Sequence, residues 1–135
     1  MSYIAKCQCE RVCVECQTEP EMVWACHCHA CQRRTGAPVA VIAYFRAETL
    51  NFSGDKREFV RYGDGGAKVT NYFCLNCGTT VHYEAPEVLP GLMAIDSGLF
   101  NEKNFPKPSM ACYTKRRCSW LLPFEDVPSF EAAPT

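Results

Sequence analysis

The sequence has little that would place the chain in a membrane, on nucleic acid or outside the cell. No apolar run approaches the roughly 20 residues that a membrane-spanning helix needs, so we expect no membrane partner. The formal net charge is only −1, which gives no electrostatic reason to expect nucleic acid as a partner. The first residues show no basic region followed by an apolar segment, which a signal peptide would have, so we expect a cytoplasmic protein.

Helical periodicity is scarce as well, and β patterns take its place. No segment keeps apolar residues at helical spacing for more than about two turns. The segments that we expect to be strands are residues 11–16, 22–25, 39–45, 58–62, 68–73, 79–83, 92–95 and 110–114. A turn or a single helical turn is expected at 33–38 and a turn at 51–55, and the glycine-rich residues 63–66 predict a hairpin. With no repeat or linker, the chain is expected to form one all-β domain over residues 1–135, built from several hairpins.

Cysteine is the residue that the chain has in excess, with 11 in 135 residues. Thiols stay reduced in the cytosol, so this number favours metal binding over disulfides. The odd count and the tight Cys-x-Cys spacings agree with that interpretation. A secreted, disulfide-rich scaffold is the alternative, and the missing signal peptide weighs against it.

The central cysteines lie in the hexapeptide Cys26-His27-Cys28-His29-Ala30-Cys31. In an extended chain Cys26 and Cys28 point to the same face, and Cys28 and Cys31 have the spacing of a metal-binding turn. Three convergent thiolates suit Zn²⁺ and are one ligand short of a closed structural site. An open fourth position is typical of a catalytic or ligand-binding zinc. The alternative is a second structural zinc, closed by His27, His29 or His82.

A second set of cysteines has the spacing of a closed zinc site. Cys74-Leu75-Asn76-Cys77-Gly78 has the pattern of a zinc knuckle, in which backbone amides fold back toward the sulfur atoms and Gly78 permits a left-handed turn. Cys7 and Cys9 can supply the other two ligands of a structural Cys₄ site. A rival pairing joins the knuckle to the hexapeptide instead. We prefer the first, because it combines pairs with pairs and leaves the triplet open.

Taken together, these motifs resemble the glutathione-dependent formaldehyde-activating enzyme family, which has an Mss4-like β fold. The resemblance runs from about Cys7 to Trp120. It rests on Cys7-x-Cys9, on Cys26 to Ala37 with its Arg33 and Gly36, and on Phe73-Cys74-x-x-Cys77-Gly78-Thr79, with a weaker segment from Tyr113 through Arg117 to Trp120. The family usually has glycines where this chain has Ala5 and Glu10, and a common histidine is replaced at Ala111.

The resemblance implies two zinc ions per chain and a carbon–sulfur lyase-type activity. Cys7, Cys9, Cys74 and Cys77 would hold the structural zinc, and Cys26, Cys28 and Cys31 the catalytic one. The reaction would form or cleave an adduct between a thiol such as glutathione and an aldehyde such as formaldehyde. Arg33 and Arg34 follow the hexapeptide and could receive a carboxylate of the thiol; a solvated turn is the equal alternative.

Two other functions stay open at this point. One is a non-enzymatic, zinc-stapled module that binds another protein, in which the triplet has a fourth protein ligand. The other is a relative of the methionine-R-sulfoxide reductases, with Cys118 as its reactive cysteine. Cys13 and Cys16 are expected to pack in a strand, the basic run at 115–117 to be exposed, and Cys112 has no assigned role. The sequence does not give the oligomeric state.

Overall fold

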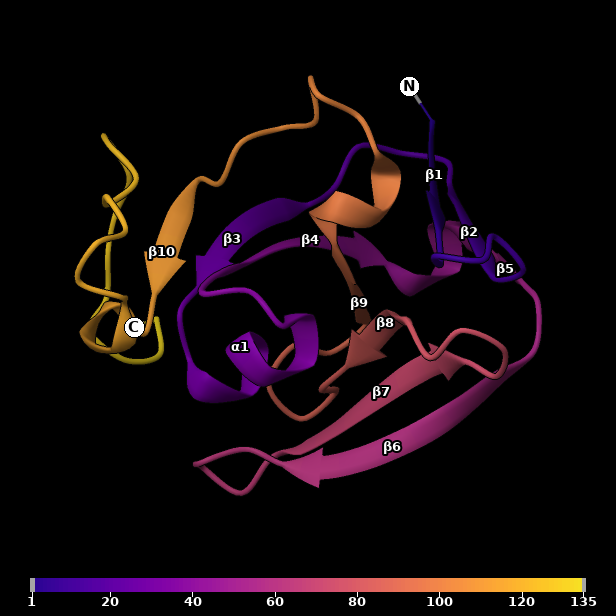
Figure 1. Ribbon diagram of the computed structural model, residues 1–135, viewed down its shortest axis with the longest axis horizontal. Helices are drawn as coiled ribbons and strands as arrows, with labels where there is room; N and C mark the ends of the chain where they lie inside the picture. Colours follow the sequence, from indigo (N-terminus) through magenta and orange to yellow (C-terminus); the bar gives the residue numbers. More distant parts are fainter. Residues whose placement is uncertain (1, 135) are drawn as a thin grey trace.

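Two β-sheets make up most of the protein (Figure 1). The structure is a computed structural model that describes residues 2–134, and 39% of the chain is strand and 13% helix, so the expected all-β class is confirmed. The smaller sheet has the order β1–β2–β5, with strands Tyr3–Lys6, Cys13–Cys16 and Leu50–Ser53. The larger sheet has the order β10–β3–β4–β9–β8–β7–β6, with strands Met110–Cys112, Met22–Cys26, Ala40–Arg46, Leu92–Asp96, Thr80–Glu84, Lys68–Cys74 and Lys56–Tyr62.

The expected strands are present, and the structure adds two. The hairpin of β6 and β7 forms around the glycine-rich turn as predicted. The expectation of a turn at 51–55 was wrong in part, because Leu50–Ser53 is strand β5 and only Gly54, with φ 97°, turns away. The sequence also gave no signal for β1. Both strands are short, and each becomes a strand by pairing with β2.

The α-helix α1, His29–Thr35, begins directly after the cysteine hexapeptide's first half. The turn or single helical turn expected at 33–38 is therefore the end of a longer helix. Gly36 ends it with φ 70°, a left-handed conformation that glycine adopts without strain. In Figure 1, α1 lies between β4 and the hairpin of β6 and β7. Three short 3₁₀ helices are also present, η1 Ala47–Thr49, η2 Ser97–Phe100 and η3 Thr114–Arg116.

The larger sheet separates two apolar clusters, since alternate residues of its strands point to opposite faces. In β4, Ala43 and Phe45 pack on one face toward the small sheet. Ile42 and Tyr44 pack on the other face, together with Cys26 and Cys31. The hexapeptide therefore lies on the face away from the small sheet. No helix between residues 2 and 134 is long and apolar enough to cross a membrane. One domain over residues 1–135 stays a prediction.

Candidate metal centres and the adjoining cavity

The structure brings the sulfur atoms of Cys7, Cys9, Cys74 and Cys77 together within 4.8 Å of one another. We call them the four-cysteine cluster. The Sγ atoms of Cys7 and Cys9 are 3.6 Å apart, and those of Cys9 and Cys74 are 3.7 Å apart. Tetrahedral zinc with Zn–S bonds of about 2.3 Å needs sulfur atoms about 3.8 Å apart. The spacing and the all-sulfur donor set fit a zinc ion.

Backbone amides surround the sulfur atoms of this cluster, as expected for a zinc knuckle. The amides of Asn76 and Cys77 donate to Cys74 Sγ over 3.3 and 3.5 Å, and Gly78 turns with φ 80°. On the N-terminal side, Val12 N donates to Cys7 Sγ over 3.2 Å. Glu10 has φ 66°, which explains why glycine suits this position. These donors stabilise thiolates, the form that binds metal.

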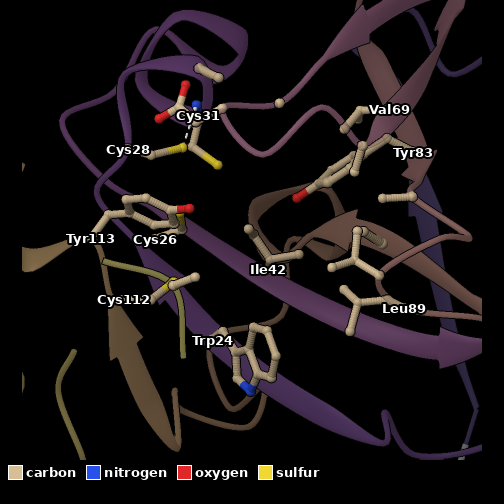
Figure 2. Close-up of a pocket in the computed structure, with 18 of the residues that line it drawn as sticks. Trp24, Cys26, Cys28, Cys31, Ile42, Val69, Tyr83, Leu89, Cys112 and Tyr113 are labelled. Atoms are coloured by element: carbon tan, nitrogen blue, oxygen red, sulfur yellow. Dashed lines mark hydrogen bonds between the residues drawn. The ribbon is translucent and has the colours of Figure 1, made fainter. Parts of the chain in front are cut away.

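The sulfur atoms of Cys26, Cys28 and Cys31 form a second group, also within 4.8 Å of one another. We call it the three-cysteine cluster. Cys26 ends strand β3, Cys28 is the N-cap of α1, and Cys31 lies in the first turn of the helix. Cys28 Sγ accepts from the amide of Cys31 over 3.4 Å, drawn as a dashed line in Figure 2. The change from strand to helix within six residues thus makes the three thiols converge.

Hydrogen bonds between the thiols of this cluster shift their pKa values in opposite directions. Bonds from Cys26 and Cys31 lower the pKa of Cys28 to about 2. The pKa of Cys26 is raised, first by its hydrogen bond with Cys112 and then by that with Cys28. The pKa of Cys31 is raised by its bonds with the other two cysteines of the cluster. The cluster thus has one thiolate hydrogen-bonded by two thiols. A soft metal ion would displace the thiol protons and be bound by all three sulfur atoms, so the donor set fits zinc here too.

Within residues 2–134, no histidine or carboxylate joins the three-cysteine cluster. His27 is buried and His29 exposed, with its Nδ1 3.4 Å from a guanidinium nitrogen of Arg116. His82 lies elsewhere, with Nε2 2.6 Å from Lys56 Nζ and Nδ1 3.1 Å from Met93 Sδ. None of the three histidines considered as a fourth ligand is therefore in a ligating position.

Arg34 is fully engaged within the protein. Its side chain is 4% exposed and forms an ion pair with Asp96, with Nη2 2.9 Å from Oδ1 and Nε 3.3 Å from Oδ2. Nη2 also donates to the Tyr83 hydroxyl over 2.9 Å, and Nη1 reaches Cys31 Sγ over 3.5 Å. The guanidinium stacks 3.9 Å from the centre of the Tyr83 ring. This arrangement positions Cys31 and leaves Arg34 poorly placed to receive a substrate carboxylate.

Arg33 points instead to a cleft of about 430 Å³ beside the helix. We call it the basic cleft, and Arg61 and the exposed His29 also line it. Neither Arg33 nor Arg61 forms an ion pair within residues 2–134. Asn71 lines the same cleft, and its Oδ1 is buried without a hydrogen-bond partner in the described structure. The cleft thus offers two cations that are not in ion pairs.

A second hollow, a mostly apolar cavity of about 420 Å³, opens directly on the three-cysteine cluster (Figure 2). We call it the apolar cavity. Its walls carry Trp24, Ile42, Tyr44, Val69, Leu89 and Ala94. Each of these apolar residues resembles an ordinary core residue in the sequence, so sequence patterns gave no signal for the cavity. Arg34 and Arg61 line both the cavity and the basic cleft, and the two hollows therefore adjoin.

Cys112 and Tyr113 are two residues at this site whose role the sequence left open. β10 runs parallel to β3 and places Cys112 opposite Cys26, so this thiol lies against the three-cysteine cluster (Figure 2). Tyr113 follows it with φ 53°, a left-handed conformation that is costly for a bulky residue. Its ring lies beside Cys26 and Cys28 in Figure 2. Only the pairing of two strands far apart in sequence reveals these neighbours.

The remaining candidates lie outside both clusters. Cys16 is buried in the core, where burial raises its pKa to about 12, as a packing cysteine should show. Cys13 is half-buried, and its thiol faces the backbone oxygen of Glu10. Cys118 is half-buried and does not line the apolar cavity. In the basic run at 115–117, only Lys115 is exposed, and Arg116 lines the cavity, contrary to the expected exposure.

Comparisons with known proteins agree with this geometry. A search of curated proteins found no match. A solved structure of a Rhodobacter sphaeroides protein superimposes with a TM-score of 0.52 at 18% identity, covering 93% of this chain and 98% of that one, which supports the fold alone. The family model described as "Glutathione-dependent formaldehyde-activating enzyme" matches residues 2–116. The chain therefore belongs to the glutathione-dependent formaldehyde-activating enzyme family.

Proposed function

We propose that the protein is a zinc-dependent carbon–sulfur lyase-type enzyme that forms or cleaves an adduct between a glutathione-like thiol and an aldehyde. The observation that carries this proposal is the three-cysteine cluster: three convergent sulfur atoms, no fourth protein ligand within residues 2–134, and an adjoining cavity. The four-cysteine cluster is assigned a structural zinc. When bound at the three-cysteine cluster, zinc would lower the pKa of an incoming thiol, which is otherwise near 8.5 and mostly protonated at neutral pH.

The basic cleft would recognise the charged groups of a glutathione-like thiol. Glutathione carries carboxylates and an amino group. Arg33 and Arg61 would receive a carboxylate. The cleft adjoins the cavity that opens on the cysteines, so a thiol bound in this way has its sulfur directed toward the cluster. In this proposal Arg61 takes the role of carboxylate contact that the sequence suggested for Arg34, because the donors of Arg34 are engaged within the protein.

The reaction itself needs orientation and one proton donor. In the forward direction the sulfur attacks the carbonyl carbon, a C–S bond forms, the C=O double bond becomes a single bond, and the thiol proton ends on oxygen. Cleavage reverses these changes. Tyr113 lies beside the cluster in the cavity, and its neutral phenol would donate a hydrogen bond to the developing oxyanion. Its left-handed conformation is consistent with a side chain held for this purpose.

The test is exchange spectroscopy of isotopically labelled formaldehyde and glutathione with the zinc-loaded protein. We expect the protein to speed exchange into the hydroxymethyl adduct, and Cys28→Ser to lower that acceleration by more than about 100-fold while the circular dichroism spectrum stays native. Cys13→Ser, outside both clusters, is the matched control and should keep the activity. If Cys28→Ser unfolds the protein and the wild type gives no acceleration, the protein is a zinc-stapled binding module instead.

A further inference from the structure

We propose that the aldehyde handled at this site carries an apolar chain or ring of about six carbons or more, and that the apolar cavity binds it. This inference rests on the proposed function and names its substrate class. The cavity measures about 420 Å³. Formaldehyde is about the size of one or two water molecules, which take about 30 Å³ each in the liquid, so it would leave most of this volume unfilled.

The shape of the sheet makes the cavity continuous with the ligating cysteines. Alternate residues of β3 share a face, so Trp24 lies on the same face as Cys26. In the neighbouring strand Ile42 pairs with Trp24, and Tyr44 extends the same face to Ala94 of β9. A group attached to a carbon at the cluster would therefore run along an apolar wall (Figure 2).

The opposite wall is apolar as well. It is formed by Val69 of β7 and by Leu89 and Leu92 around the start of β9. Arg34 and Tyr83, two of the polar residues that line the cavity, bond to each other, and Arg34 also bonds to Asp96. An apolar occupant would leave none of them without a partner. Burying an apolar chain beside these groups therefore costs no hydrogen bond that they make.

The thiol itself is a poor occupant for the cavity. Glutathione would bring carboxylates against Ile42 and Ala94. Arg61 and Arg116, the lining cations with no ion pair within residues 2–134, lie where the cavity meets the basic cleft, because Arg61 lines both hollows and Arg116 contacts His29, which also lines both. The carboxylates of Asp64 and Glu84 also line the cavity and would repel it. Burying an unpaired carboxylate is costly, whereas the basic cleft next door offers Arg33 and Arg61. The two hollows therefore divide the adduct, with the charged thiol part in the cleft and the apolar aldehyde part in the cavity.

The test is a homologous series of aldehydes that differ in length but little in reactivity: acetaldehyde, butanal and hexanal, each with glutathione and the zinc-loaded protein. Each buried methylene group should raise kcat/KM about fourfold, so hexanal, with four more of them, should exceed acetaldehyde roughly 250-fold. As non-reacting probes, S-hexylglutathione should inhibit at least about 30 times more strongly than S-methylglutathione. Equal kcat/KM values across the series, or equal inhibition, would overturn the proposal.

A matched pair of variants places the effect in the cavity. Leu89→Trp narrows it and should reduce the hexanal-to-acetaldehyde ratio at least 10-fold. Leu122→Trp makes the same change at an exposed residue that does not line the cavity and should leave the ratio as in the wild type. An unchanged ratio in a folded Leu89→Trp protein would contradict the assignment. If that variant does not fold, the inhibitor pair on the wild type decides.

Thiol binding separates failure of this inference from failure of the proposed function. In cobalt-substituted protein, the sulfur-to-metal absorption band should grow and saturate as glutathione is added. If the band grows but chain length has no effect, the substrate class is wrong and the enzymatic proposal stands. If glutathione leaves the band unchanged and no aldehyde in the series reacts, both proposals fall.

Discussion

The four-cysteine cluster draws its sulfur atoms from two segments of the chain, with Cys9 and Cys74 separated by 65 positions. The three-cysteine cluster draws all of its sulfur atoms from six consecutive residues. A metal that joins distant segments restricts the unfolded chain and stabilises the fold, while one bound within a single turn restricts it very little. The first cluster adjoins the core beside the small sheet, and the second opens on a cavity. Both clusters have thiol ligands only, and their different locations in the chain are the reason why we propose a structural role for the first and a reactive role for the second.

Removal of metal should therefore affect the two clusters in sequence, and this is the largest effect that we expect. A strong chelator should remove the zinc of the three-cysteine cluster without loss of the circular dichroism signal. It should remove the zinc of the four-cysteine cluster only as the protein unfolds. A structural zinc contributes on the order of 10 kcal/mol, comparable to the whole stability of a small domain. Zinc release, measured with a colorimetric dye, is followed together with the dichroism signal.

Cys28→Ser identifies which cluster releases first. In this variant the early, silent phase of zinc release should disappear, while the later phase and its unfolding remain. If the early release is instead coupled to unfolding, or if both zinc ions leave a folded protein, the division into a structural and a reactive cluster is wrong.

The three-cysteine cluster has a different source of stability, the buried pair of Arg34 and Asp96. Arg34→Met should lower the free energy of unfolding by about 3 kcal/mol, because it leaves the half-buried Asp96 carboxylate without its partner. Denaturant unfolding of the zinc-loaded protein measures the loss. Arg34→Met combined with Asp96→Leu should recover much of it, since both charges are then absent. A loss below about 1 kcal/mol in the single variant would show that the pair does not support this region.

Sequence patterns predicted the local parts of this structure and missed the parts that depend on distant pairing. The hairpin of β6 and β7 follows from alternation and glycine, and both cysteine sets follow from their spacing. The turn predicted at 51–55 overlaps strand β5, because the four residues of β5 become a strand only beside β2. The choice between Arg33 and Arg34 could not be made from two adjacent identical residues. The helix distinguishes them, because it directs Arg34 toward Asp96 and Arg33 toward the basic cleft.

Two glycines give the finest test of the comparison, one in each region. Gly54 lies at the end of β5 in the small sheet, and a Cβ there would lie 2.2 Å from the backbone oxygen of Arg11. Gly36 ends α1, and a Cβ there would meet nothing within 4 Å. Both have positive φ, 97° and 70°, so alanine is strained at either position. The difference between them is the backbone contact.

Gly54→Ala should therefore cost about 3 kcal/mol in unfolding free energy, and Gly36→Ala about 1 kcal/mol. Because the contact in the small sheet holds the segment between Cys9 and β2, Gly54→Ala should also speed zinc loss from the four-cysteine cluster, whereas Gly36→Ala should leave that rate unchanged. Thermal unfolding and dye-monitored zinc release measure the two effects. An equal loss of unfolding free energy in the two variants would mean that the backbone near Arg11 can move to make room for the new Cβ. The four-cysteine cluster, and not the packing around it, would then hold this region in place.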